Sequence, residues 1–123
     1  MLQALERSPL VLLQMPAERI TDADTLHDLR YGIANMVQSV IQQVKIAGLV
    51  VVGGETASII ASNLQISAIQ ILREIEAGVP LGRIIGGLAD SLLIVTKAGG
   101  FGSERTLGSI AKWFGAWQER KEE

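Results

Sequence analysis

Two glycine-rich segments contain the residues best suited to bind an anion. The first has the sequence GGET at residues 53–56, and the second has the sequence KAGGFG at residues 97–102. Glycine lets the backbone approach a ligand without an intervening Cβ, and unpaired amides at the start of a helix favour a phosphate. A lysine at the end of a strand adds a positive charge. The pattern predicts a phosphate site, with a tight strand-to-helix turn and a flexible loop as the structural alternatives.

The first segment matches neither of the two common phosphate-binding motifs. It lacks the Lys-Ser/Thr pair of the P-loop and the glycine spacing of the dinucleotide-binding fingerprint. Glu55 also brings a carboxylate next to the candidate phosphate site. This carboxylate would repel a phosphate unless it caps the helix, binds a ribose hydroxyl or reaches a metal ion.

The elements around both segments predict that they share one edge of a sheet. Residues 49–52 (LVVV) are apolar without alternation, which is typical of a strand covered on both faces, and a helix over 56–64 follows them. Strands are also expected at 83–85 and 92–95, and Gly86 and Gly87 between them indicate a hairpin. The second strand of this hairpin leads into the second glycine-rich segment. If strands 49–52 and 92–95 are parallel neighbours, the two segments enclose one cleft, because ligands of such sheets bind beyond the carboxyl ends of the strands.

The remaining segments complete an α/β fold. A strand is expected at 9–14, a weaker one at 66–75 and a turn at 78–82. Thr21 is expected to cap a long helix that runs to about residue 44. Ser103 is expected to cap a last helix, whose apolar face consists of Leu107, Ile110, Ala111, Phe114 and Trp117. We therefore predict a single domain with a mixed, largely parallel sheet and helices packed on it.

Composition excludes several classes of function. Eleven Lys and Arg against thirteen Asp and Glu give little support for nucleic-acid binding. The chain has no cysteine, so disulfides, thiolate zinc sites and a cysteine nucleophile are excluded. His27, the single histidine, is expected at the surface, and no metal site of the protein's own is predicted. Neither a membrane span nor a signal pattern is recognisable, so a cytoplasmic location is the default.

Three motifs, in this order and spacing, resemble the C-terminal nucleotide-binding domain of the four-carbon acid sugar kinases. They are GGETA at 53–57, EIEAGVPLG at 74–82 and VTKAGGFG at 95–102, within a resemblance that runs from about residue 9 to about residue 107. The family, as the resemblance implies, phosphorylates sugar acids such as erythronate and threonate with ATP. An N-terminal domain holds the sugar acid, and the C-terminal domain holds the nucleotide with Mg²⁺.

The resemblance also implies which residues contact ATP. It assigns this role to the GGET turn and to Gly99, and we infer the same role for Lys97 and Gly100. The predicted cofactor-binding residues are therefore Gly53, Gly54, Glu55, Thr56, Lys97, Gly99 and Gly100. Ala77 stands where the family usually has proline, a change that should leave the turn intact. No catalytic base is identified.

Parts of the family pattern have no counterpart before Met1. These are the sugar-acid domain and a first strand with a serine turn that touches ATP. We therefore expect residues 1–123 to be a partial nucleotide-binding domain that is inactive in transfer by itself. The alternative is a non-enzymatic module for nucleotide binding, anion binding or assembly. A domain without this first strand should leave a sheet edge or an apolar face uncovered, and such surfaces tend to pair with another subunit. We therefore predict a homodimer, with Phe114 and Trp117 of the last helix as contributors.

Overall fold

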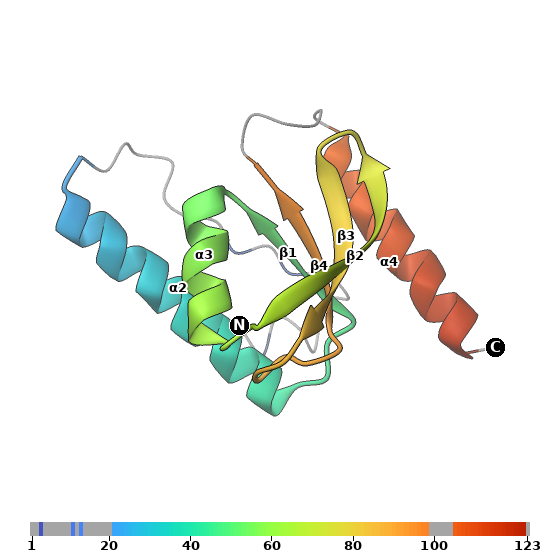
Figure 1. Ribbon diagram of the computed structural model, residues 1–123, viewed down its shortest axis with the longest axis horizontal. Helices are drawn as coiled ribbons and strands as arrows, with labels where there is room; N and C mark the ends of the chain where they lie inside the picture. Colours follow the sequence, from blue (N-terminus) through green and yellow to red (C-terminus); the bar gives the residue numbers. More distant parts are fainter. Residues whose placement is uncertain (1–2, 4–10, 12, 14–20, 99–104, 123) are drawn as a thin grey trace.

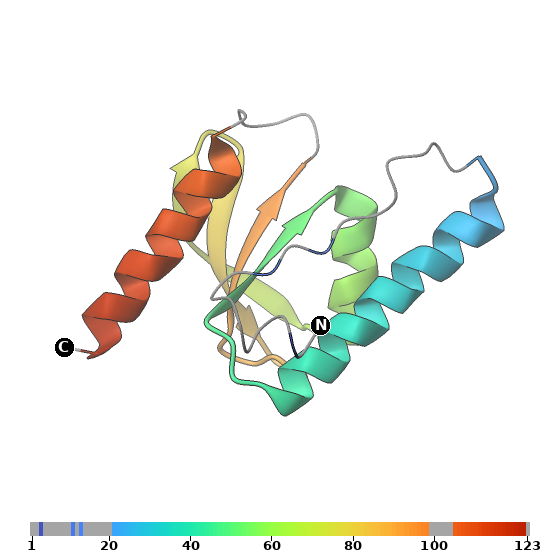
Figure 2. The same ribbon diagram turned by 180° about the vertical axis from the view of Figure 1, so that it is seen from behind.

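The computed structural model describes residues 3, 11, 13, 21–98 and 105–122. Its centre is a four-stranded sheet of β1 (Gly48–Val52), β4 (Leu93–Lys97), β3 (Val79–Ile85) and β2 (Ala68–Glu76), in that order. Helices α2 (Ala23–Gln43) and α3 (Gly54–Asn63) lie on one side of the sheet, and α4 (Thr106–Glu122) lies on the other (Figures 1 and 2). The predicted α/β class with a mixed sheet is confirmed. None of the described helices is long and apolar enough to cross a membrane.

The described sheet contains fewer parallel pairs than predicted. Strands β1 and β4 are parallel, whereas β3 is antiparallel to both β4 and β2. The antiparallel pair of β3 and β4 agrees with the predicted hairpin, and the turn predicted at 78–82 is confirmed only at its first residue. Strand β3 already begins at Val79, so a tight turn of Ala77 and Gly78 (φ 78°) separates it from β2. Short connections of this kind join antiparallel strands, because parallel strands need a long crossover.

The core consists of two clusters, one on each face of the sheet. The first lies beneath α2 and α3 and contains Ala34, Val51, Ile60, Leu64, Ile84, Ala89 and Ile94. The second lies beneath α4 and contains Val79, Leu81, Leu93, Val95 and Ile110. Strand β1 contributes to both, with Leu49 packed against the first cluster and Val50 against the second. The prediction that β1 is covered on both faces is wrong at Val52, the last residue of the strand, which is 45% exposed.

Helix α2 confirms the predicted long helix but begins with a different cap. The N-cap residue is Asp22, not Thr21. Its Oδ2 accepts a hydrogen bond from the Thr25 hydroxyl at 2.5 Å, and its Oδ1 accepts one from the Asp24 amide at 3.2 Å. These bonds lower the pKa of Asp22, with the Thr25 bond as the largest cause. The cap therefore stabilises the helix at neutral pH, and this contribution is lost as the pH falls below the ordinary carboxyl range.

Helix α4 packs through a face that agrees with the predicted one at Ile110 and Phe114 and differs from it elsewhere. Thr106 and Ile110 are buried, and Trp113 and Phe114 pack against the second cluster, which places the contact at positions i, i+4, i+7 and i+8. Leu107, expected on this face, is 46% exposed. The Ser103 cap lies outside the described residues, as does the strand predicted at 9–14 apart from two isolated positions.

Candidate functional site

The two glycine-rich segments begin side by side, as predicted. Strands β1 and β4 are parallel neighbours whose last residues, Val52 and Lys97, are paired. The Gly53 amide continues this pairing by donating a hydrogen bond to the Lys97 carbonyl at 2.8 Å. The carboxyl ends of both strands therefore open at one edge of the sheet.

The start of α3 presents free backbone amides at this edge. Gly53 is the N-cap residue, with φ 103°, and no side chain caps the helix. This left-handed φ is one that a residue with a Cβ rarely adopts. At Gly54 an added Cβ would meet no atom within 4 Å. The backbone here is thus open to a ligand, and the unpaired amides with the helix dipole favour an anion.

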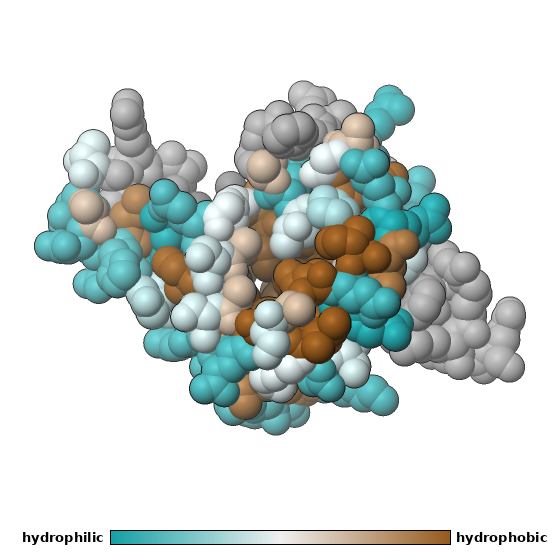
Figure 3. Space-filling model, in the orientation of Figure 1, coloured by the Kyte–Doolittle hydropathy of each residue, from teal (hydrophilic) through white to brown (hydrophobic). Residues whose placement is uncertain are grey.

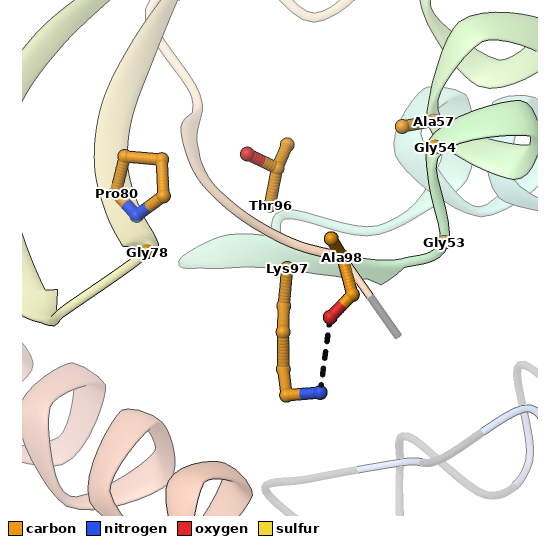
Figure 4. Close-up of a pocket in the computed structure, with 8 residues that line it drawn as sticks. All are labelled: Gly53, Gly54, Ala57, Gly78, Pro80, Thr96, Lys97 and Ala98. Atoms are coloured by element: carbon orange, nitrogen blue, oxygen red, sulfur yellow. Dashed lines mark hydrogen bonds between the residues drawn. The ribbon is translucent and has the colours of Figure 1, made fainter. Parts of the chain in front are cut away.

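A pocket of about 390 Å³ joins the strand ends to the start of β3. This volume is within the range of small-molecule and cofactor sites. The lining residues, drawn in Figure 4, are Gly53, Gly54, Ala57, Gly78, Pro80, Thr96, Lys97 and Ala98. The structure therefore brings three of the predicted site residues, Gly53, Gly54 and Lys97, to one pocket.

Other predicted site residues are not part of the lining. Glu55 and Thr56 belong to the first turn of α3 but do not line the pocket, and Gly99 and Gly100 lie outside the described residues. Conversely, five lining residues were not predicted to belong to the site: Ala57, Gly78, Pro80, Thr96 and Ala98. The available signal was that all five belong to the motifs of the family resemblance.

The Glu55 carboxylate forms an ion pair with Arg30 of α2. Its side chain is 75% exposed and directed to the neighbouring helix, so it is neither the helix cap nor a pocket group. The pair links α2 to the first turn of α3. It also neutralises the charge that would oppose an anion near Gly54.

Lys97 and Thr96 leave β4 on opposite faces of the sheet, because neighbouring residues of a strand alternate. In Figure 4 the Thr96 side chain points between Pro80 and Ala57, whereas the Lys97 side chain points the other way. The Lys97 Nζ donates a hydrogen bond to the Ala98 carbonyl at 3.3 Å. A contact between this ammonium and a phosphate in the pocket therefore requires another rotamer of Lys97.

Metal-ligating residues are sparse around the pocket. Within the described ranges, no group of three His, Cys, Asp or Glu residues is placed to hold a metal ion. His27 is exposed, as predicted, and its ring centroid lies 4.5 Å from that of Tyr31.

Known proteins with similar sequences are D-threonate kinases. The chain is 49% identical over 61 residues to the enzyme of Bordetella bronchiseptica and 36% identical over 78 residues to that of Salmonella typhimurium. These matches cover 50% and 63% of this chain but only 15% and 18% of the two enzymes. The chain thus spans less than a fifth of the length of these curated relatives.

Solved structures show the same fold. A Bordetella bronchiseptica protein described as a domain of unknown function, crystallised as a domain-swapped dimer with bound citrate, matches with a TM-score of 0.77 and 32% identity. The match covers 92% of this chain and 28% of that protein. A Haemophilus influenzae protein matches with a TM-score of 0.57 and 20% identity over 76% of this chain and 25% of that one, a likeness of fold alone.

A family model gives the widest match in sequence. The model described as "Nucleotide-binding C-terminal domain" matches residues 3–107, which include all three motifs and the whole pocket lining. The chain belongs to this family, the C-terminal nucleotide-binding domains of four-carbon acid sugar kinases.

Proposed function

We propose that this chain is the ATP- or ADP-binding part of a kinase that phosphorylates four-carbon sugar acids of the threonate or erythronate type. The observation that carries the proposal is the pocket at the joint carboxyl ends of β1 and β4, lined by the Gly53–Gly54 turn. The similar D-threonate kinases support the class of acceptor. In such an enzyme, catalysis depends mainly on positioning the phosphates and stabilising their charge.

The phosphates of the nucleotide occupy the part of the pocket next to Gly53 and Gly54, where the amides of α3 donate to them. We propose that Gly99 and Gly100, which follow Ala98 in the sequence, also contact the nucleotide. Mg²⁺ enters with the nucleotide and is held by phosphate oxygens and water. The pocket residues are a poor magnesium site by themselves, because the described lining contains no carboxylate and the nearby Glu55 is paired with Arg30. Transfer also needs an acceptor site from the remainder of the kinase.

Calorimetric titration with Mg-ATP tests the proposal. We expect a Kd on the order of 0.1 to 1 mM, or about −5 to −4 kcal/mol, because residues 1–123 span less than a fifth of the length of the related kinases. Gly54→Val should weaken binding at least about tenfold, or by about 1.4 kcal/mol, since its methyls occupy open space at the phosphate position.

Gly32→Val is the matched control for this variant. Gly32 is also an exposed helical glycine with nothing within 4 Å of an added Cβ, but it lies in α2 and not in the pocket. Wild-type affinity of the Gly32→Val protein shows that the loss is local. An absence of binding by the wild-type chain, or equal binding by a folded Gly54→Val protein, would contradict the proposal.

The proposal includes a homodimer, which the domain-swapped dimer of the similar Bordetella protein supports. Phe114 packs in part against the second cluster of its own chain, so its contribution to a dimer stays a prediction, and Trp117 lies beyond the described side chains. Exposed apolar side chains that a partner could cover lie on β2, namely Ile71 and Leu72. Figure 3 shows a hydrophobic area over this strand. Light scattering at high micromolar concentration should give twice the chain mass of 13.2 kDa, and a monomer there would refute the dimer.

A further inference from the structure

The connection between β2 and β3 forms the wall of the pocket opposite the glycine turn. Strand β4 lies between β1 and β3, and β3 runs antiparallel to β4. The first residues of β3 therefore lie beside the last residues of β4, at the same edge where β1 ends. This topology brings Gly78 and Pro80 into the lining together with Gly53 and Gly54.

Side-chain alternation places Pro80 and Thr96 on one face of the sheet. Thr96 is two residues from Ile94, and Pro80 is four residues from Ile84, and both isoleucines belong to the cluster beneath α3. Ala57 of α3 also packs against this cluster. Figure 4 shows the Thr96 side chain between the Pro80 ring on one side and Ala57 on the other. This part of the pocket thus has two apolar walls with one hydroxyl between them.

Hydrogen bonds hold the connection in place before any ligand binds. The Gly78 amide donates to Oε1 of Glu74 at 2.9 Å. Next to it, Oε2 of Glu76 accepts a hydrogen bond at 2.8 Å from the hydroxyl of Thr106, a fully buried residue at the start of α4. The proline ring also fixes φ at Pro80, the second residue of β3. A wall that is already ordered loses little entropy when a ligand packs against it.

The two halves of the pocket differ in the chemistry that they offer. Gly53 and Gly54 present amides and a helix start, which suit phosphate oxygens. Pro80 and Ala57 present apolar surface, and the Thr96 hydroxyl can donate or accept one hydrogen bond. A nucleoside has the matching properties, since its base is flat with apolar faces and polar edges, whereas polyphosphate does not.

We propose that Pro80, Ala57 and Thr96 form the nucleoside half of the pocket. The base packs between Pro80 and Ala57, and the Thr96 hydroxyl bonds to a polar atom of the base or the ribose. The inference rests on the proposed nucleotide binding and adds an orientation to it. The nucleoside lies over the face of the sheet that α3 covers, and the phosphates lie at the start of α3.

Titrations of the whole chain with Mg-ADP and with Mg-tripolyphosphate test this orientation. Pro80→Ala removes the ring surface, and Thr96→Val removes the hydroxyl while it keeps the shape of the side chain. Each variant should weaken ADP binding about three- to tenfold and change tripolyphosphate binding less than twofold. Gly54→Val, in contrast, should weaken the binding of both ligands. Ile85→Ala, at the other end of β3 and 45% exposed, is the control for general effects on the strand.

The ADP titrations decide the inference. Unchanged ADP affinity in folded Pro80→Ala and Thr96→Val proteins would overturn it, and so would an equal loss for ADP and tripolyphosphate. If Pro80→Ala fails to fold, Thr96→Val decides alone. If tripolyphosphate binds too weakly to measure, a loss of ADP affinity that the Ile85→Ala protein does not share still supports the inference. Failure of the proposed function has a different signature, since the wild-type chain would then not bind ADP.

Discussion

Gly87→Ala is expected to lower the free energy of unfolding by about 3 kcal/mol. Gly87 has φ 79°, where a residue with a Cβ costs roughly 1–2 kcal/mol. An added Cβ would also press against the backbone carbonyl oxygens of Leu64 and Gln65, and overpacking of this kind costs about 1–3 kcal/mol. The loop cannot simply retreat, because the Leu88 amide donates to the Leu64 carbonyl at 3.0 Å. For a domain with about 5–15 kcal/mol of stability this is a large loss.

Urea unfolding followed by tryptophan fluorescence measures this change, with Gly32→Ala as the control. Gly32 is an exposed residue of α2, and an added Cβ there meets no atom within 4 Å. Alanine at this position should stabilise the protein by about 0.5–1 kcal/mol, because glycine is a poor helix former. The two alanine variants should thus shift the stability in opposite directions. A Gly87→Ala protein within about 0.5 kcal/mol of wild type would refute the assigned strain and contact.

The second large effect concerns phosphoryl transfer. The 123-residue chain should bind nucleotide but phosphorylate D-threonate or erythronate no faster than background. Transfer requires an acceptor held in line with the terminal phosphate, and such positioning is worth roughly 7–11 kcal/mol, or a factor of about 10⁵ or more. The residues of the described pocket are proposed to bind the nucleotide, and none of them is assigned to the sugar-acid acceptor. Adding a sugar-acid domain of the family, in trans or by fusion, should therefore restore product formation, measured by ³¹P NMR.

The restored enzyme also tests the lysine at the end of β4. Lys97→Ala should reduce the rate more than it weakens ATP binding if the ammonium rotates to meet the transferring phosphate. Full activity of this variant would remove the role proposed for Lys97. Sugar-acid phosphorylation by the 123-residue chain alone would overturn the larger division of labour between the two domains.

The elements that the sequence predicted well have strong local signals. The apolar stripe of α2, the β-branched run of β1 and the glycine turn before α3 each depend on neighbours within a few residues. The same is true of the hairpin of β3 and β4, whose loop contains Gly86 and Gly87 with positive φ. These local features placed a glycine-rich segment after each of β1 and β4, whereas the parallel pairing of the two strands was an assumption that the structure confirms.

The features that the sequence did not predict depend on distant partners. The glycines around Pro80 predict a turn from local sequence. Its observed position near the start of β3 depends instead on the pairing of β3 with β2 and with β4. Glu55 had three possible roles near a phosphate, and the observed one depends on Arg30 in another helix. The packed face of α4 was predicted from apolar residues alone. The polar Thr106 also belongs to this face, because its hydroxyl donates a hydrogen bond to the carboxylate of Glu76 on β2.

The most direct test of the proposed site is to map where nucleotide binds on the isotope-labelled chain. Mg-ADP should shift the backbone amide NMR signals of Gly53, Gly54, Gly78 and Ala98, and the side-chain signals of Thr96, along one saturation curve. The amides of residues 40–43, in the last turn of α2, should not move, because they lie neither in the pocket nor next to the Arg30–Glu55 ion pair. Shifts that saturate together elsewhere on the molecule, with the signals of Gly53 and Gly54 unchanged, would contradict a nucleotide site between the two glycine-rich segments.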